Sequence, residues 1–212
     1  MNKSKLALEF SCFFLLLPGV LVALNIRSIF YPVLWGAFFA CFYWLHKHSV
    51  YSIAQDWKGR TLTKTVIKEI LKRFSVLAIP LLAFTWWYAP EKLFAFPLNN
   101  FSTWLLVMFA YPVLSVVPQE LIFRSFFLRR YATIFPSEKY LWLASALCFG
   151  WAHVVIQTWI SVVFSAIGGW IFTTTYARTR SLAAACFEHA LYGCYIFTIG
   201  LGWYFYHANG MR

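Results

Sequence analysis

Long apolar runs separated by short polar segments dominate the pattern along the chain. A helix needs about 20 apolar residues to cross a hydrocarbon core of about 30 Å. Seven segments approach that length: Leu6–Leu24, Ser28–Leu45, Phe74–Ala89, Phe101–Leu128, Tyr140–Ile156, Trp159–Tyr176 and Leu182–Tyr206. The pattern therefore predicts an all-α, polytopic transmembrane helix bundle with about seven membrane-spanning helices, forming a single integral membrane domain over residues 1–212.

Two segments depart from a simple row of straight helices. The fourth segment is long and contains Pro112 and Pro118, which predict a kink because proline removes a helical hydrogen bond. The only long polar segment, His46–Arg73, has apolar residues on one helical face and basic residues on the other in its second half. We expect an amphipathic helix there, lying on the membrane surface before the chain turns into the third crossing.

Composition and charge support a membrane protein. The chain is 61% hydrophobic and only 12% charged, whereas soluble domains carry about 25% charged residues. The net charge of +11 does not indicate nucleic-acid binding in so apolar a chain. With the N-terminus in the cytoplasm, most of the 18 Lys and Arg residues fall on the cytoplasmic side, as the positive-inside rule requires.

A few ionisable side chains lie inside the apolar segments, where a charge costs at least about 2.5–3.5 kcal/mol. They are Glu120, Arg124, His153, Glu188 and His189. At about 1.5 Å per residue, Glu120 and His189 lie roughly 12 Å from the cytoplasmic helix ends and His153 roughly 20 Å. We therefore expect these five residues to line one polar cavity that opens to the cytoplasmic side.

Each of these residues also has a purely structural interpretation. Glu120 and Arg124, four residues apart, form a neutralising pair on one helix in that interpretation. His153 alone is compatible with a hydrogen bond that joins two helices. The combination on three segments favours a functional site, because intramembrane ionisable groups normally face a cavity or a polar path.

Three ordered motifs resemble those of the CPBP (CAAX protease and bacteriocin-processing, Abi) family of glutamic-type intramembrane proteases. The motifs are QELIFR from Gln119 to Arg124, FGWAH from Phe149 to His153, and His189 followed by Gly193. The resemblance covers roughly residues 101–206. It implies hydrolysis of a peptide bond in a membrane-associated substrate near the cytoplasmic face, in a bacterial inner (cytoplasmic) membrane.

Two positions depart from the family motifs Glu-Glu-x-x-x-Arg and His-x-x-x-Asn: Gln119 replaces the first Glu, and Gly193 replaces the Asn. An amide cannot act as a general base. We therefore expect His153 to activate water together with Glu188 or Glu120. Glu188 comes first, because it has no cation on its own helix turn.

The remaining roles follow the resemblance and the chemistry of the side chains. His189 and Gln119 would stabilise the oxyanion, and Arg124 would hold Glu120. Phe149 and Gly193 would give structural support. The expected partners are a membrane-associated peptide or protein substrate and the lipid bilayer.

Two other functions are alternatives to this interpretation, and zinc is the cofactor to be considered. The departures at Gln119 and Gly193 favour a non-catalytic relative that acts as a membrane scaffold or immunity protein. A proton-coupled transporter with a Glu/His relay is a weaker alternative, because the chain shows no internal repeat. We expect no cofactor: histidines and carboxylates are able to bind zinc, but the HExxH motif is absent.

Overall fold

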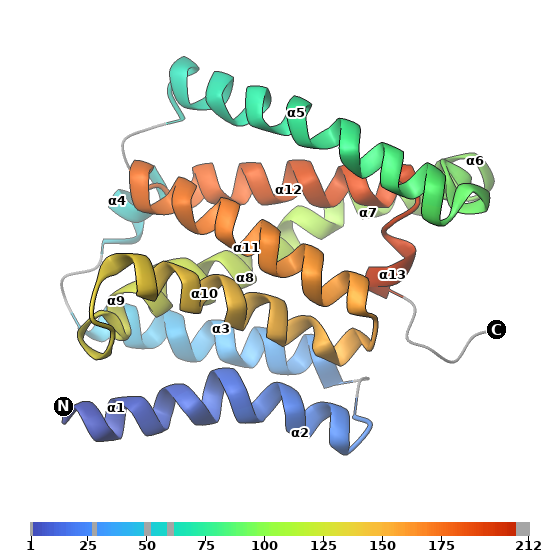
Figure 1. The fold of residues 1–212 in the computed structure, drawn as a ribbon. Coiled ribbons are helices and arrows are strands. Elements are labelled where there is room, and N and C mark those ends of the chain that lie inside the picture. The colour runs from blue at the N-terminus through green and yellow to red at the C-terminus, as the bar shows by residue number, and fades with distance from the viewer. Residues whose placement is uncertain (1, 27–28, 49–51, 59–61, 207–212) are drawn as a thin grey trace.

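The computed structural model describes residues 2–26, 29–48, 52–58 and 62–206. In these ranges the regular elements are all helical, and the long helices lie side by side as a bundle (Figure 1). The N-terminal helices α1 and α2 form one edge of the view and α5 the opposite edge, with α10, α11 and α12 between them. The predicted all-α fold is confirmed.

The helices follow one another without intervening strands in the described part of the chain. In order they are α1 (Lys3–Phe10), the π-helix η1 (Ser11–Leu16), α2 (Leu17–Ala23), α3 (Phe30–Lys47), α4 (Ile53–Lys58), α5 (Lys64–Tyr88), η3 (Pro90–Lys92), α6 (Ala95–Asn99), α7 (Phe101–Tyr111), the π-helix η4 (Pro112–Val116), α8 (Val117–Glu120), the π-helix η5 (Leu121–Phe126), α9 (Phe127–Arg130), η6 (Ala132–Ile134), α10 (Glu138–Ala152), η7 (His153–Ile156), α11 (Trp159–Thr179), α12 (Leu182–Ile199) and α13 (Trp203–Tyr206).

Five helical stretches in the described residues are long and apolar enough to cross a membrane. They are Lys3–Ala23, Phe101–Arg130, Glu138–Ile156, Trp159–Thr179 and Leu182–Ile199. The structure does not show the seven spans that the sequence predicts, since α3 and α5 are not among the five. The physical reason is composition: α3 is rich in Trp and Tyr and ends in His46 and Lys47, and the first half of α5 is charged. The chain is a helical membrane protein with several apolar spans.

The helix α5 corrects a second prediction. It runs without a break from Lys64 to Tyr88, and the Thr63 side chain caps it by accepting a hydrogen bond from the Val66 backbone N–H at 3.3 Å. The expected turn at Arg73, between a surface helix and a crossing, is therefore wrong. The basic first half and the apolar second half form one helix, which places Arg73 against the bundle.

The stretch from Phe101 to Arg130, where the sequence predicts a kink, departs from regular α-helix near its prolines. Pro112 begins the π-helical turns of η4, and a second π-helix, η5, follows Pro118. Proline has no N–H to donate, and wide π turns are often found at functional sites. Within this stretch Tyr111, Ser115 and Gln119 recur every four positions, so they lie on one helical face.

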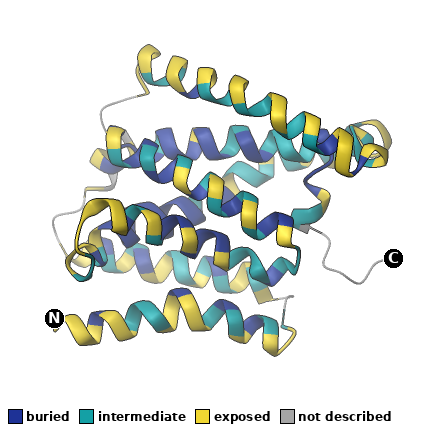
Figure 2. Cartoon of the chain, in the orientation of Figure 1, coloured by how far each residue is buried: buried dark blue, intermediate teal, exposed yellow. Residues whose placement is uncertain are grey.

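Small residues allow α10 and α11 to approach closely. A Cβ atom added at Gly169 would lie 3.1 Å from the Cα of Ala146, and Ser161 and Ser165 of α11 are buried. The small residues of this segment therefore serve the packing of the two helices. Buried residues accordingly concentrate on the central helices, whereas α1 and α5 expose one face (Figure 2).

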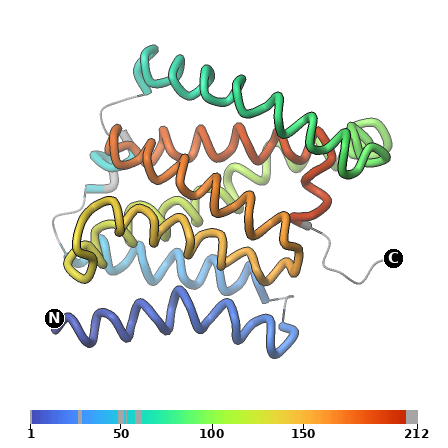
Figure 3. Tube along the Cα trace, viewed as in Figure 1, coloured from blue at the N-terminus to red at the C-terminus, as the bar shows by residue number. Residues whose placement is uncertain are grey.

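One end of the bundle is basic, and we call it the basic end; its basic residues include Lys3, Lys64, Arg129, Arg130 and Arg178. It carries α4, α9 and the first turns of α1, α5 and α12, which Figure 3 shows together. There Asp56 of α4 accepts hydrogen bonds from Arg129 at 2.6 Å and from the Tyr176 hydroxyl at 2.5 Å. Glu9 of α1 pairs with Arg130 at 2.6 Å. These ion pairs join α4 and α1 to the central helices.

Candidate functional site

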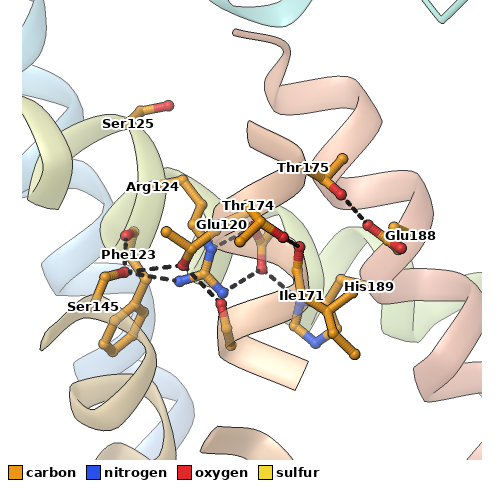
Figure 4. A network of polar contacts seen from close by, with 12 residues as sticks. Glu120, Phe123, Arg124, Ser125, Ser145, Ile171, Thr174, Thr175, Glu188 and His189 are labelled. Atoms are coloured by element: carbon orange, nitrogen blue, oxygen red, sulfur yellow. Dashed lines mark hydrogen bonds and ion pairs between the residues drawn. The ribbon is translucent and has the colours of Figure 1, made fainter. Parts of the chain in front are cut away.

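Glu120 lies at the centre of a buried ionic cluster formed by α8, η5 and α12. One carboxylate oxygen, Oε1, is 2.8 Å from the His189 Nδ1 atom, and the other, Oε2, is 3.1 Å from the Arg124 Nε atom (Figure 4). The Glu120 and Arg124 side chains are fully buried. Because each charge has its opposite within contact distance, the cluster is nearly neutral as a whole.

Arg124 is held on a second side by α10. Its guanidinium donates a hydrogen bond to the Ser145 hydroxyl at 3.3 Å, and this hydroxyl in turn donates to the Phe123 carbonyl at 2.7 Å. The Phe149 ring lies 5.0 Å from the guanidinium carbon, within the range of a cation–π contact. Arg124 therefore neutralises Glu120 while it fixes α10 against η5.

His189 is fixed in orientation by its neighbours. The Phe172 ring stacks on the imidazole with centroids 4.5 Å apart, and the Phe149 ring meets it edge-on at 5.5 Å. A carboxylate accepts hydrogen bonds, so the Nδ1 atom donates its hydrogen to Glu120. The Nε2 atom on the opposite side of the ring lies 3.0 Å from the Tyr111 hydroxyl.

His153 carries the second imidazole of the site, at the C-terminal end of α10. Its Nδ1 atom lies 2.8 Å from the Phe149 carbonyl oxygen. A carbonyl oxygen only accepts, so Nδ1 carries the hydrogen and Nε2 of the neutral ring has a free lone pair. This second nitrogen gives His153 a proton-accepting group.

Both imidazoles line one cavity of about 440 Å³. Most of its lining is aromatic or aliphatic, and the polar groups include Tyr111, Ser115 and Gln119. Gln119 donates from its amide nitrogen to the Ser115 hydroxyl at 2.8 Å. Its amide oxygen is buried and has no hydrogen-bond partner among the described residues. An apolar cavity with a few converging polar groups is typical of a ligand site.

The cavity differs from the expected one in its lining and position. Glu120, Arg124 and Glu188 do not line it, because Glu120 and Arg124 pair behind His189. Its lining includes Phe84 near the end of α5 and Phe205 of α13, so it lies away from the basic end. The expectation that all five ionisable residues line one cavity is therefore wrong, because only His153 and His189 line it.

Glu188 lies next to His189 in the sequence but faces other helices. Its carboxylate is 2.7 Å from the Arg73 guanidinium of α5 and accepts a hydrogen bond from the Thr175 hydroxyl at 2.5 Å. Adjacent helix positions point about 100° apart, which separates the two side chains. Arg73 is the cation that the sequence analysis did not find near Glu188, because it comes from a distant segment.

The ion pair of Glu188 gives a first testable prediction. Glu188→Gln should lower stability by about 1–3 kcal/mol, because the Arg73 guanidinium loses its carboxylate partner. Any activity should stay within about three-fold of the wild type, since the carboxylate lies outside the cavity. Thermal unfolding in detergent micelles and an activity assay in liposomes would measure the two effects. Lost turnover in a well-folded variant would instead support Glu188 as the general base.

Gly193 leaves room for a residue that the sequence analysis missed. A Cβ atom at this position would lie closer than 3.0 Å to three atoms of the Tyr111 side chain. Tyr111 fills the space next to His189 where a longer side chain at position 193 would project. The four-residue spacing of Tyr111, Ser115 and Gln119 was the available sequence signal for this polar face.

The fold and the site define a helical membrane protein with a buried Glu–His–Arg cluster beside an apolar cavity. Residues 100–195 match the family model described as Rce1-like, type II CAAX prenyl endopeptidase Rce1-like. Residues 100–195 are therefore an Rce1-like domain of the CPBP (Abi) family. No curated protein and no solved structure matches the chain. The matched segment contains Glu120, His153 and His189.

Proposed function

We propose that this protein is an intramembrane endopeptidase that hydrolyses a peptide bond of a membrane-associated substrate. The observation that carries the proposal is the pair of imidazoles at one apolar cavity. His153 has a free accepting nitrogen there, and His189 is tied to the buried carboxylate of Glu120. Membership of the endopeptidase family supports the same reaction type.

The residues support the following steps. His153 accepts a proton at Nε2 from a water molecule, whose oxygen attacks the carbonyl carbon of the substrate. The carbonyl oxygen becomes an oxyanion beside His189, which has taken a second proton from solvent before the reaction and whose positive form is stabilised by Glu120. The carbon–nitrogen bond then breaks, and His153 returns the proton to the leaving amine. Neither Gln119 nor Glu188 takes a proton in this scheme, and Arg124 keeps Glu120 in place.

The lining of the cavity indicates the kind of substrate. Aromatic and aliphatic side chains such as Phe84, Phe164 and Phe197 surround most of it. Such a surface suits an apolar segment that enters from the bilayer. We place the cleaved bond at the level of His153 and His189.

A second candidate function is a non-catalytic relative that binds apolar membrane segments. The observation that favours it is the Gln119 amide, which pairs with Ser115 at the place where the family motif has a carboxylate. Purified protein in liposomes, incubated with peptides that carry an apolar membrane anchor, separates the two candidates. Cleavage products in the mass spectrum would support the peptidase, and binding without products the second candidate.

The same assay tests a variant in which position 119 carries the carboxylate of the family motif. Gln119→Glu should raise turnover by about 10-fold or more, because a second general base beside the cavity adds to His153. The Ser115 hydroxyl, which now accepts from Gln119, is able to donate to the new carboxylate. Gln55→Glu is the matched control, since it adds the same charge on the exposed surface of α4. An equal gain in turnover in both variants would contradict the interpretation that the carboxylate at position 119 acts as a general base.

A further inference from the structure

We infer that Tyr111 supplies the hydroxyl that donates a hydrogen bond to the oxyanion, an inference that rests on the proposed peptidase function. Tyr111 lines the cavity together with His153 and His189. Its hydroxyl is 3.0 Å from the His189 Nε2 atom, so it directly contacts the imidazole of the buried cluster.

The position of Tyr111 depends on the absence of a side chain at residue 193. The phenol lies against Gly193, where a Cβ atom would be closer than 3.0 Å to its ring and to its hydroxyl oxygen. The ring also meets the Phe197 ring edge-on, with centroids 5.3 Å apart. Tyr111 and Gly193 therefore form one unit in which the glycine makes room for the phenol.

The hydrogen bonds of the cluster explain how the phenol would act. Glu120 accepts from Nδ1 of His189, which stabilises an imidazole that has taken its second proton from solvent before the substrate binds. In that state Nε2 donates to the phenol oxygen, and the phenol hydrogen is free to point into the cavity. The hydroxyl then donates to the oxyanion while Glu120, His189 and Tyr111 stay in contact. His153 alone carries the proton taken from water.

The first test removes only the hydroxyl. Tyr111→Phe should lower kcat by about 10²–10³-fold, the loss typical of one oxyanion donor, with KM nearly unchanged. Tyr195→Phe is the matched control: it lies on α12, loses a phenol hydrogen bond to the Ala78 carbonyl at 2.9 Å, and does not line the cavity. Its turnover should equal that of the wild type. Wild-type turnover in Tyr111→Phe would overturn the inference.

The second test moves the phenol without removing it. Gly193→Ala should push the Tyr111 hydroxyl away from His189 and lower kcat, although no polar group is lost. Combined with Tyr111→Phe, it should cost little more than Tyr111→Phe alone, because both changes remove the same interaction. Fully multiplicative losses in the double variant would show that Gly193 acts independently of the hydroxyl, which would contradict the inference.

A binding measurement separates this inference from the proposed function. A peptide aldehyde with an apolar membrane anchor forms a tetrahedral hydrate, and Tyr111→Phe should weaken its binding about 10-fold or more while the matching alcohol is unaffected. If neither the wild type nor Gln119→Glu cleaves any anchored peptide, the proposed function fails. Equal aldehyde affinity in the wild type and Tyr111→Phe overturns the role of Tyr111 whether or not cleavage is observed.

Discussion

Arg124→Leu should lower the stability of the protein by about 3–5 kcal/mol and sharply reduce the folded yield, because the fully buried Glu120 carboxylate would lose its cation. The change also removes the hydrogen bond to Ser145 and the contact with the Phe149 ring. Size-exclusion profiles and thermal unfolding in detergent micelles would measure the loss. Because Arg124 connects η5 with α10, we expect turnover per folded molecule to fall as well.

The matched control is an ion pair of the same kind at the surface. Arg178 lies 3.4 Å from Glu69, and both side chains are 55% exposed. Arg178→Leu should therefore cost less than about 1 kcal/mol. In a second variant, Glu120→Leu combined with Arg124→Leu should regain part of the lost stability, since no unpaired charge remains. Equal losses in Arg124→Leu and Arg178→Leu would contradict the role assigned to the buried pair.

The fold was predictable where apolar length decides the structure. Phe101–Leu128 and Trp159–Tyr176 are long apolar runs, and the structure has helices there with nearly the same bounds. Prediction was less accurate where the backbone conformation of a single residue determines where a helix ends. The helix α12 ends at Ile199 because Gly200 adopts a φ of +101°, a conformation that favours glycine, so the predicted helix to Tyr206 is divided. The continuity of α5 was hidden because its polar and apolar halves have different compositions.

The candidate site was predictable as far as local spacing carries information. Glu120 and Arg124 are four residues apart on one helix, and their predicted pairing is confirmed. The contact between Glu120 and His189 joins two segments far apart in the sequence, and only the packing of α12 on α8 determines it. The same holds for Arg73 beside Glu188 and for Tyr111 beside Gly193. Partners supplied by distant helices are therefore what the sequence analysis missed.

His153→Ala should give the largest loss of turnover among the single variants, about 10²–10⁴-fold in kcat with little change in KM. In the proposed mechanism His153 alone accepts the proton from water and returns it to the amine. No neighbouring carboxylate replaces it, because Glu120 is engaged by His189 and Arg124. Cleavage of anchored peptides in liposomes, followed by mass spectrometry at several substrate concentrations, would separate kcat from KM.

The chain offers a close control for this variant. His48 follows α3 as His153 follows α10, and its Nδ1 atom lies 2.9 Å from the carbonyl oxygen four residues earlier, that of Trp44. Each imidazole also contacts the aromatic ring of that earlier residue, with centroids 4.4 Å apart for His48 and 4.8 Å for His153. His48 is exposed and does not line the cavity. His48→Ala should therefore remove the same kind of helix-end contact and leave turnover unchanged. If both variants lose turnover equally, the loss comes from the missing contact at the end of the helix, and His153 is not the general base.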